Sequence, residues 1–93
     1  MIRHIVMWKF RPGMEKEQGQ FLTGLQALYG VVPQLKACEV AVNIGKDNYD
    51  AVLVSDFESL KDLEDYKNDP RHKVLSNLCK SIREDRVAVD YEY

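Results

Sequence analysis

Hydrophobic residues recur with two different spacings along the chain. Some stretches alternate apolar and polar residues, as strands do, whereas others repeat apolar residues three or four positions apart, as amphipathic helices do. In order, these stretches predict strand, helix, strand, strand, helix and strand. The predicted strands cover residues 2–11, 35–45, 49–57 and 86–93, and the predicted helical regions cover residues 14–32 and 59–82.

The predicted first strand is apolar on both faces. Val6 and Trp8 lie on one face, while Ile5 and Met7 lie on the other. A strand of this kind needs cover on both sides, unlike a strand at the surface of a sheet. We therefore expect helices against one face of the sheet and a second sheet against the other.

Apolar stripes identify the residues that we expect to face the core. The first helix should stop before Pro33, and the second helical region should start at Ser59, whose hydroxyl can cap it. The predicted core-facing residues are Phe21, Leu22, Leu25, Leu28, Tyr29 and Val32 in the first helix, Cys38, Val40, Val42 and Ile44 in the second strand, and Leu60, Leu63, Tyr66, Val74, Leu75, Leu78, Cys79 and Ile82 in the second helical region.

The element order β-α-β-β-α-β leaves few possible topologies, because crossover connections are right-handed. It predicts an α+β protein with a ferredoxin-like fold over residues 1–93, a single domain with a four-stranded antiparallel sheet and helices on one face. Residues 45–48 should form the loop of a hairpin. The uncovered, apolar face of the sheet is expected to pack against a second copy of the chain.

The second helical region is interrupted where a tyrosine and a histidine lie six positions apart. Asp69 is suited to cap a helix, and Pro70 is suited to its first position. His72 then lies in the first turn, where the helix dipole disfavours a positive charge. We predict a neutral imidazole that can accept a proton. Tyr66 ends the preceding helix, so the bend can bring the two side chains together.

Composition excludes several classes of function. The net charge is −2 and the charges are interspersed, which argues against a nucleic-acid-binding stripe, and no apolar run reaches membrane length. The sequence has no metal-ligand spacing, phosphate-binding loop or nucleophile motif, so we expect neither a metal nor a cofactor. Cys38 and Cys79 are expected to be free thiols of a cytoplasmic protein.

The chain resembles the stress-responsive dimeric α/β-barrel domain family. The resemblance rests on the His-Ile-Val-Met-Trp-Lys-Phe segment at 4–10, the Asp-Phe-Glu-Ser-Leu segment at 56–60, the spacing of Tyr66, Pro70 and His72, and the Val-Asp-Tyr segment at 89–91. It implies a homodimer whose two sheets form a barrel.

The resemblance also implies site residues. The family includes a plant polyketide cyclase that closes a linear polyketide by an aldol reaction, with a histidine as base and a tyrosine as its partner. These residues match His72 and Tyr66, and two further positions match His4 and Asp90. Two histidines of the cyclase appear here as Asp50 and Asp69, and the hairpin is shorter, so the plant substrate is not expected.

Three hypotheses follow for the function. The first is a binding module that holds a small hydrophobic or aromatic metabolite in a pocket between helices and sheet. The second is a cofactor-free enzyme of the polyketide cyclase or monooxygenase type, with His72 as base and Tyr66 as hydrogen-bond partner. The third is a purely structural assembly unit. The pocket is predicted to be lined by His4, Val6, Trp8, Tyr66 and His72, with Asp90 as a further ligand-binding candidate.

Each of these residues also has a purely structural interpretation. His4 can be a buried histidine bonded to a backbone carbonyl or to Asp90. His72 can simply cap its helix, and Tyr66 can be a wall residue whose hydroxyl reaches the surface. Trp8 is of a type found more often in the core than in a ligand site.

Overall fold

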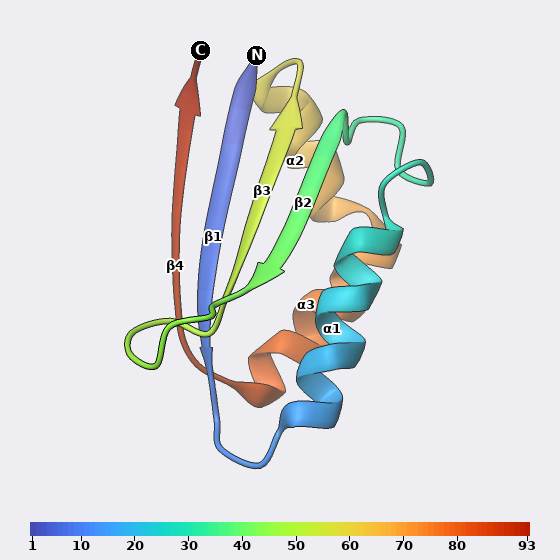
Figure 1. The fold of residues 1–93 in the computed structure, drawn as a ribbon. Helices are drawn as coiled ribbons and strands as arrows, with labels where there is room; N and C mark the ends of the chain where they lie inside the picture. The colour runs from blue at the N-terminus through green and yellow to red at the C-terminus, as the bar shows by residue number, and fades with distance from the viewer.

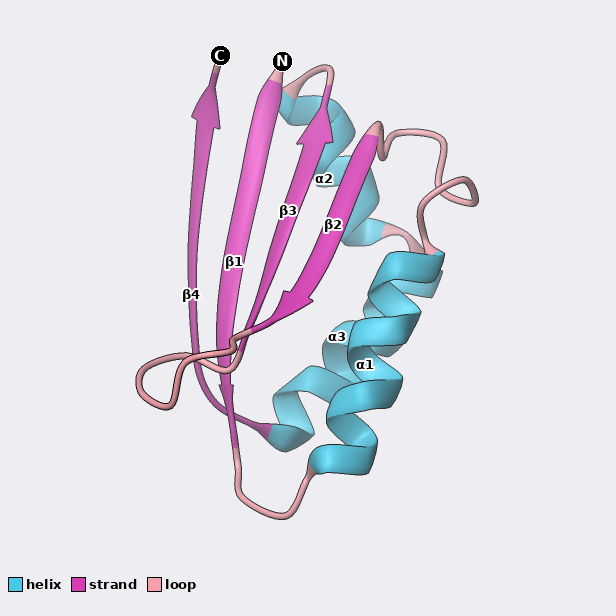
Figure 2. Cartoon of the chain, viewed as in Figure 1, coloured by secondary structure: helices cyan, strands magenta, loops and turns pink.

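Strands and helices follow one another in the predicted order (Figure 1). The structure is a computed structural model that describes residues 1–93. The second helical region consists of two helices rather than one continuous helix (Figure 2). The elements are β1 (Ile2–Phe10), α1 (Glu15–Ala27), β2 (Ala37–Val42), β3 (Ala51–Phe57), α2 (Leu60–Asn68), α3 (Pro70–Ile82) and β4 (Arg83–Glu92).

The four strands form one antiparallel sheet with the order β2-β3-β1-β4. All three helices lie on one face of this sheet, and the other face is uncovered (Figure 1). In the central strand β1, Ile2 pairs with Phe57 of β3 and with Glu92 of β4. The predicted α+β, ferredoxin-like β-α-β-β-α-β architecture is thereby confirmed.

The break between α2 and α3 has the local causes that the sequence indicates. The Ser59 hydroxyl accepts a hydrogen bond from the Asp62 amide at 3.1 Å and caps α2. A carboxylate oxygen of Asp69 accepts one from the Arg71 amide at 2.8 Å and caps α3, whose first residue is Pro70. Because Asp69 has extended backbone geometry, the chain changes direction there.

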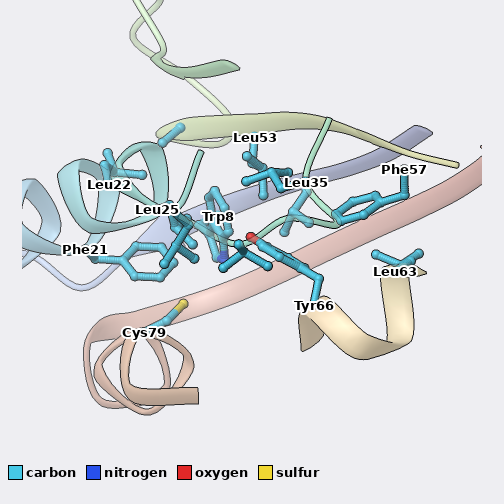
Figure 3. Packing of buried hydrophobic residues seen from close by; sticks show 14 of the residues in the cluster. Trp8, Phe21, Leu22, Leu25, Leu35, Leu53, Phe57, Leu63, Tyr66 and Cys79 are labelled. Atoms are coloured by element: carbon cyan, nitrogen blue, oxygen red, sulfur yellow. The ribbon is translucent and has the colours of Figure 1, made fainter. Parts of the chain in front are cut away.

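Alternation along β1 places its helix-facing side chains in the core, where Trp8 packs edge-on against Phe21 at a centroid distance of 5.0 Å. Figure 3 shows this packing between the sheet and the helices. Trp8 and Phe21 are buried, as predicted, and Phe57 is buried as well. No helix of the protein combines the length and the hydrophobicity needed to cross a membrane.

Five residues predicted to face the core are instead exposed, and one of them, Val42, is the last residue of β2. Tyr29 lies beyond the end of α1, which is shorter than predicted, and Ile44 lies beyond the end of β2. Leu60 lies about 120° around α2 from buried Tyr66, and Val74 lies about 140° around α3 from buried Cys79. The pattern includes the last two because Leu60 precedes Leu63 by three residues and Val74 precedes Leu78 by four, spacings that fit an apolar stripe.

Candidate ligand-binding cavity

A hollow of about 240 Å³ lies between the sheet and helices α1 and α3. Its floor is apolar and is built from β1, β3 and α1, whereas α3 and the start of β4 contribute most of its polar groups. The lining residues are His4, Val6, Trp8, Phe21, Leu25, Leu53, His72, Ser76, Cys79, Lys80, Arg83 and Arg86.

A larger hollow of about 490 Å³ lies beside the loop between β2 and β3, where its lining includes Met7 and Val52. These two residues are cross-strand neighbours on the uncovered face of the sheet. Tyr49 is the one titratable residue that lines it, and its hydroxyl is hydrogen-bonded to Asp85. The smaller hollow therefore contains more titratable side chains that could bind a ligand or transfer a proton.

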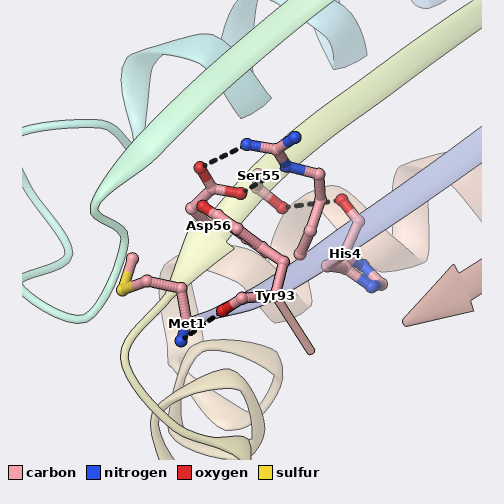
Figure 4. A network of polar contacts seen from close by, with 6 residues as sticks. Met1, His4, Ser55, Asp56 and Tyr93 are labelled. Carbon is pink, nitrogen blue, oxygen red and sulfur yellow. Dashed lines mark hydrogen bonds and ion pairs between the residues drawn. The ribbon is translucent and has the colours of Figure 1, made fainter. Parts of the chain in front are cut away.

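His4 is held in place by the last strand of the sheet. Its Nδ1 lies 2.5 Å from Oδ1 of Asp90, the residue opposite it in the register of β1 and β4. Burial lowers the pKa of His4, and the Asp90 carboxylate acts in the opposite direction. In the neutral ring, Nδ1–H donates to Asp90 and Nε2 keeps its lone pair. Figure 4 shows that the backbone oxygen of His4 also accepts a hydrogen bond, from the Ser55 hydroxyl at 3.2 Å.

His72 and Tyr66 lie against each other, with ring centroids 4.5 Å apart. Burial lowers the pKa of His72 and raises the pKa of Tyr66, so both rings are neutral at pH 7. The lowered pKa of His72 agrees with the neutral imidazole predicted from the sequence. Its largest cause is burial of the ring, whereas the prediction rested on the helix terminus. His72 Nδ1 and the Tyr66 hydroxyl are both buried without a hydrogen-bond partner.

The structure brings most of the predicted site residues together. His4, Val6, Trp8 and His72 line the hollow. Tyr66 does not line it and is 0% exposed, so the alternative of a hydroxyl at the surface is wrong.

Tyr66 is wedged between the rings of His72 and Phe57, and Asp90 reaches the site only through His4. The two aspartates found at cyclase histidine positions lie outside the lining. Asp50 accepts a hydrogen bond from the Phe10 amide, and Asp69 caps α3.

Three cationic residues of the lining were missed from the sequence. Lys80, Arg83 and Arg86 line the hollow, and no carboxylate does. The Arg86 charge is among the causes that lower the pKa of both His4 and His72. The only sequence signal for this cluster is that the three cations follow one another at intervals of three residues across the junction between α3 and β4, and this signal is weak. The chain has no group of three or more His, Cys, Asp or Glu residues that could hold a metal ion.

Solved structures with the same fold cover nearly the whole chain. A dimeric ferredoxin-like protein of unknown function from Bacteroides fragilis has a TM-score of 0.88 and 26% identity, covering 99% of this chain and 95% of its own. A second such dimeric protein, from Thermobifida fusca, has a TM-score of 0.87 and 26% identity, covering 99% and 90%. A hydroxynitrile lyase from Passiflora edulis has a TM-score of 0.86 at 20% identity, covering 97% and 90%, and shares the fold.

A comparison with curated protein sequences finds no significant match. A family model describing the stress responsive A/B barrel domain, in contrast, matches residues 2–93. This match covers every strand and helix of the fold, together with all the residues that line the cavity. The chain therefore belongs to the stress responsive A/B barrel domain family.

Proposed function

We propose that the protein binds a small hydrophobic or aromatic metabolite in the cavity between the sheet and α1 and α3. The observation that carries this proposal is a hollow with an apolar floor whose lining includes two histidines with lowered pKa values, His4 and His72. Small-molecule sites are typically concave and mostly apolar, with a few polar groups that orient the ligand. Because a cavity of about 150 Å³ holds benzene, a hollow of about 240 Å³ suits one ring with short substituents.

Filling the cavity tests this proposal. Ser76 lines the hollow from α3, so Ser76→Leu should place a larger side chain in it. Ser81→Leu is the matched control, because Ser81 is on the same helix but outside the lining. Calorimetric titration with phenol, benzyl alcohol, benzamide and benzoate should detect binding to the wild type and to Ser81→Leu. Binding should be lost in Ser76→Leu. Equal binding by the two variants, or no binding of any compound to the wild type, would refute the proposal.

A cofactor-free enzyme is the second candidate function. It is favoured by the contact between the His72 and Tyr66 rings, and by the lack of a hydrogen-bond partner for His72 Nδ1 and for the Tyr66 hydroxyl. The neutral imidazole of His72 would take a proton from a C–H next to a carbonyl, leaving an enolate and an imidazolium. Tyr66 does not line the cavity, so it would act by positioning His72 rather than by touching the substrate.

Deuterium exchange tests the enzymatic candidate without knowledge of the natural substrate. The wild type should accelerate the exchange of the acetophenone methyl protons in D₂O, and His72→Ala should not. Tyr66→Phe should keep part of the activity with a shifted pH profile, which a purely structural tyrosine would not cause. Wild-type exchange no faster than that of His72→Ala would leave binding as the function.

We also propose a homodimer formed through the uncovered face of the sheet. Met7, Val87, Val89 and Tyr91 are exposed on this face, although they are large and apolar. Neighbours of the same fold from two bacteria are dimeric. The dimer would supply the second sheet that the apolar pattern of the first strand predicts. A purely structural role would be favoured by a packed interior, whereas this protomer contains a cavity.

The state of the cysteines supports a cytoplasmic location. Cys38 and Cys79 are free, and burial raises the pKa of both thiols. Protonated thiols of this kind react slowly with disulfides. They are compatible with a reducing compartment.

A further inference from the structure

Three cationic side chains lie at the polar side of the cavity, and no carboxylate lines the hollow. Lys80, Arg83 and Arg86 all line the hollow, and none of them forms an ion pair within the chain. Two other arginines of the protein are paired, Arg3 with Asp56 at 2.9 Å and Arg71 with Asp69 at 2.8 Å. The cations around the cavity are therefore available to a ligand.

The fold explains part of this charge by itself. Lys80 lies in the last turn of α3 and Arg83 directly follows its end, where cations interact favourably with the helix dipole. Arg86 has no such explanation. It lies opposite buried Trp8 in the register of β1 and β4, and so it belongs to the helix-facing side of the sheet. An arginine at that position places a charge beside the apolar floor.

We propose that the ligand of this cavity is an aromatic carboxylate, with its ring on the apolar floor beside Trp8 and its carboxylate bound by Arg86 and Arg83. This inference rests on the proposed binding function and specifies the class of ligand. A guanidinium can donate two parallel hydrogen bonds to one carboxylate, a geometry that a neutral amide or alcohol does not satisfy equally well. Lys80 adds positive charge without that directionality.

The size of the hollow agrees with this class of ligand. About 240 Å³ accommodates one ring and a carboxylate, but not a long acyl chain. The ring would contact the faces and edges of Trp8 and Phe21, which already pack edge-on at 5.0 Å. A carboxylate held by exposed Arg86 would still be partly hydrated, so its binding should weaken as salt is added.

Benzoate and benzamide form the decisive pair of probes, because they have nearly the same shape and differ in charge. Calorimetric titration of the wild type at low salt should show benzoate binding roughly 10- to 100-fold more tightly than benzamide. Arg86→Gln and Arg83→Gln should each reduce benzoate affinity about tenfold or more and leave benzamide affinity unchanged. Arg11→Gln is the matched control, since Arg11 is exposed, forms no ion pair and lies outside this lining.

The outcomes separate this inference from the binding function on which it rests. If both probes bind equally well and Ser76→Leu abolishes both, the cavity is a binding site but the carboxylate assignment is wrong. A benzoate preference that survives in both arginine variants would also overturn the assignment. If neither probe binds, and no neutral aromatic compound does either, both proposals fail. If each variant unfolds at the same temperature as the wild type, its loss of binding is not caused by a loss of folding.

Discussion

The Nδ1 atom of His4 on the first strand and the Oδ1 atom of Asp90 on the last strand lie 2.5 Å apart. The side chain of His4 is 4% exposed, whereas that of Asp90 is 34% exposed. One partner thus lines the cavity and the other contacts solvent. The pair ties β4 to the centre of the sheet and fixes which nitrogen of His4 carries the proton.

Removal of the Asp90 carboxylate should allow the proton of neutral His4 to occupy either ring nitrogen. We expect Asp90→Ala to lower the free energy of unfolding by about 1 to 2 kcal/mol, because the buried Nδ1–H of His4 loses its acceptor. Nitrogen-detected NMR should show Nδ1 protonated in the wild type and a mixture of tautomers in Asp90→Ala. Glu92→Ala, at the next position on the same face of β4, should change neither quantity. An unaltered tautomer in Asp90→Ala would mean that another group fixes it.

Stability should fall as the pH drops through the range in which histidines titrate. Burial lowers the pKa of both His4 and His72 below the ordinary value of 6.5, so the unfolded chain binds protons more readily than the folded one. Their contribution is present above pH 6.5 and is lost as the pH falls below it. Urea unfolding between pH 8 and pH 5 should show this loss.

The carboxylates should produce a separate acid transition. The pKa of Asp56 is lowered by Arg3 and that of Asp69, to about 2, by Arg71, so their contribution is lost only below the ordinary value of 3.8. His72→Gln should therefore reduce the slope near pH 6 and leave the contribution of Asp56 below pH 4 unchanged, because His72 does not affect the pKa of Asp56. An identical slope in the wild type and His72→Gln would show that the pKa of His72 is the same in the folded and unfolded chain.

Much of the fold could be predicted because its strands obey a strict period of two. In β1 the residues predicted to line a pocket between helices and sheet, His4, Val6 and Trp8, are all buried on the face that the helices cover. Element ends were harder to place. The predicted first helix extends to residue 32, whereas α1 ends at Ala27, and the following segment turns through Gly30 at a φ of +86°. Buried Leu28 and Val32 in this irregular segment continue the apolar pattern of a helix.

The parts of the site that depend on neighbouring residues in the sequence could be predicted. The parts that depend on contacts between distant elements could not. Asp69 and Pro70 break the helix visibly in the sequence, and this break brings His72 against Tyr66. The burial of the Tyr66 hydroxyl depends on packing against other elements, so no local pattern in the sequence predicts it. Arg83 and Arg86 look like ordinary solvent-facing charges in the sequence, because their place beside the cavity depends on β4 pairing with β1.

Two glycines of α1 should respond in different ways to the same substitution. A Cβ at Gly19 meets no atom within 4 Å, so Gly19→Ala should raise the free energy of unfolding by up to about 1 kcal/mol through helix propensity. A Cβ at Gly24 would lie 2.5 Å from Cδ2 of Leu75 on α3, so that side chain must move. Gly24→Ala should therefore gain less than Gly19→Ala or lose stability.

Chemical denaturation of the two alanine variants and the wild type checks this pair directly. Gly24→Ala combined with Leu75→Ala should recover part of the helix-propensity gain relative to Leu75→Ala alone, because the obstructing atom is gone. Equal stabilisation by Gly19→Ala and Gly24→Ala would show that Leu75 moves aside freely.

The uncovered face of the sheet should determine the oligomeric state. Val89 on β4 is 55% exposed and lines an apolar hollow of about 160 Å³ together with Ile5, Met7 and Val87. A lysine at this position would put a charge from each copy into the proposed interface, where desolvation costs several kcal/mol per ion. Val89→Lys should therefore shift the protein from dimer to monomer and lower its thermal stability, since dimerisation stabilises the fold by mass action.

Sedimentation velocity at several concentrations checks the prediction for the sheet face, and Val74→Lys provides the control. Val74 is 69% exposed on α3, on the helical side of the molecule, so a lysine there should leave the dimer intact. The comparison separates the effect of added charge from the effect of its position. A wild type that sediments as a monomer at all concentrations, or a Val89→Lys variant that remains dimeric, would show that this face does not join two copies.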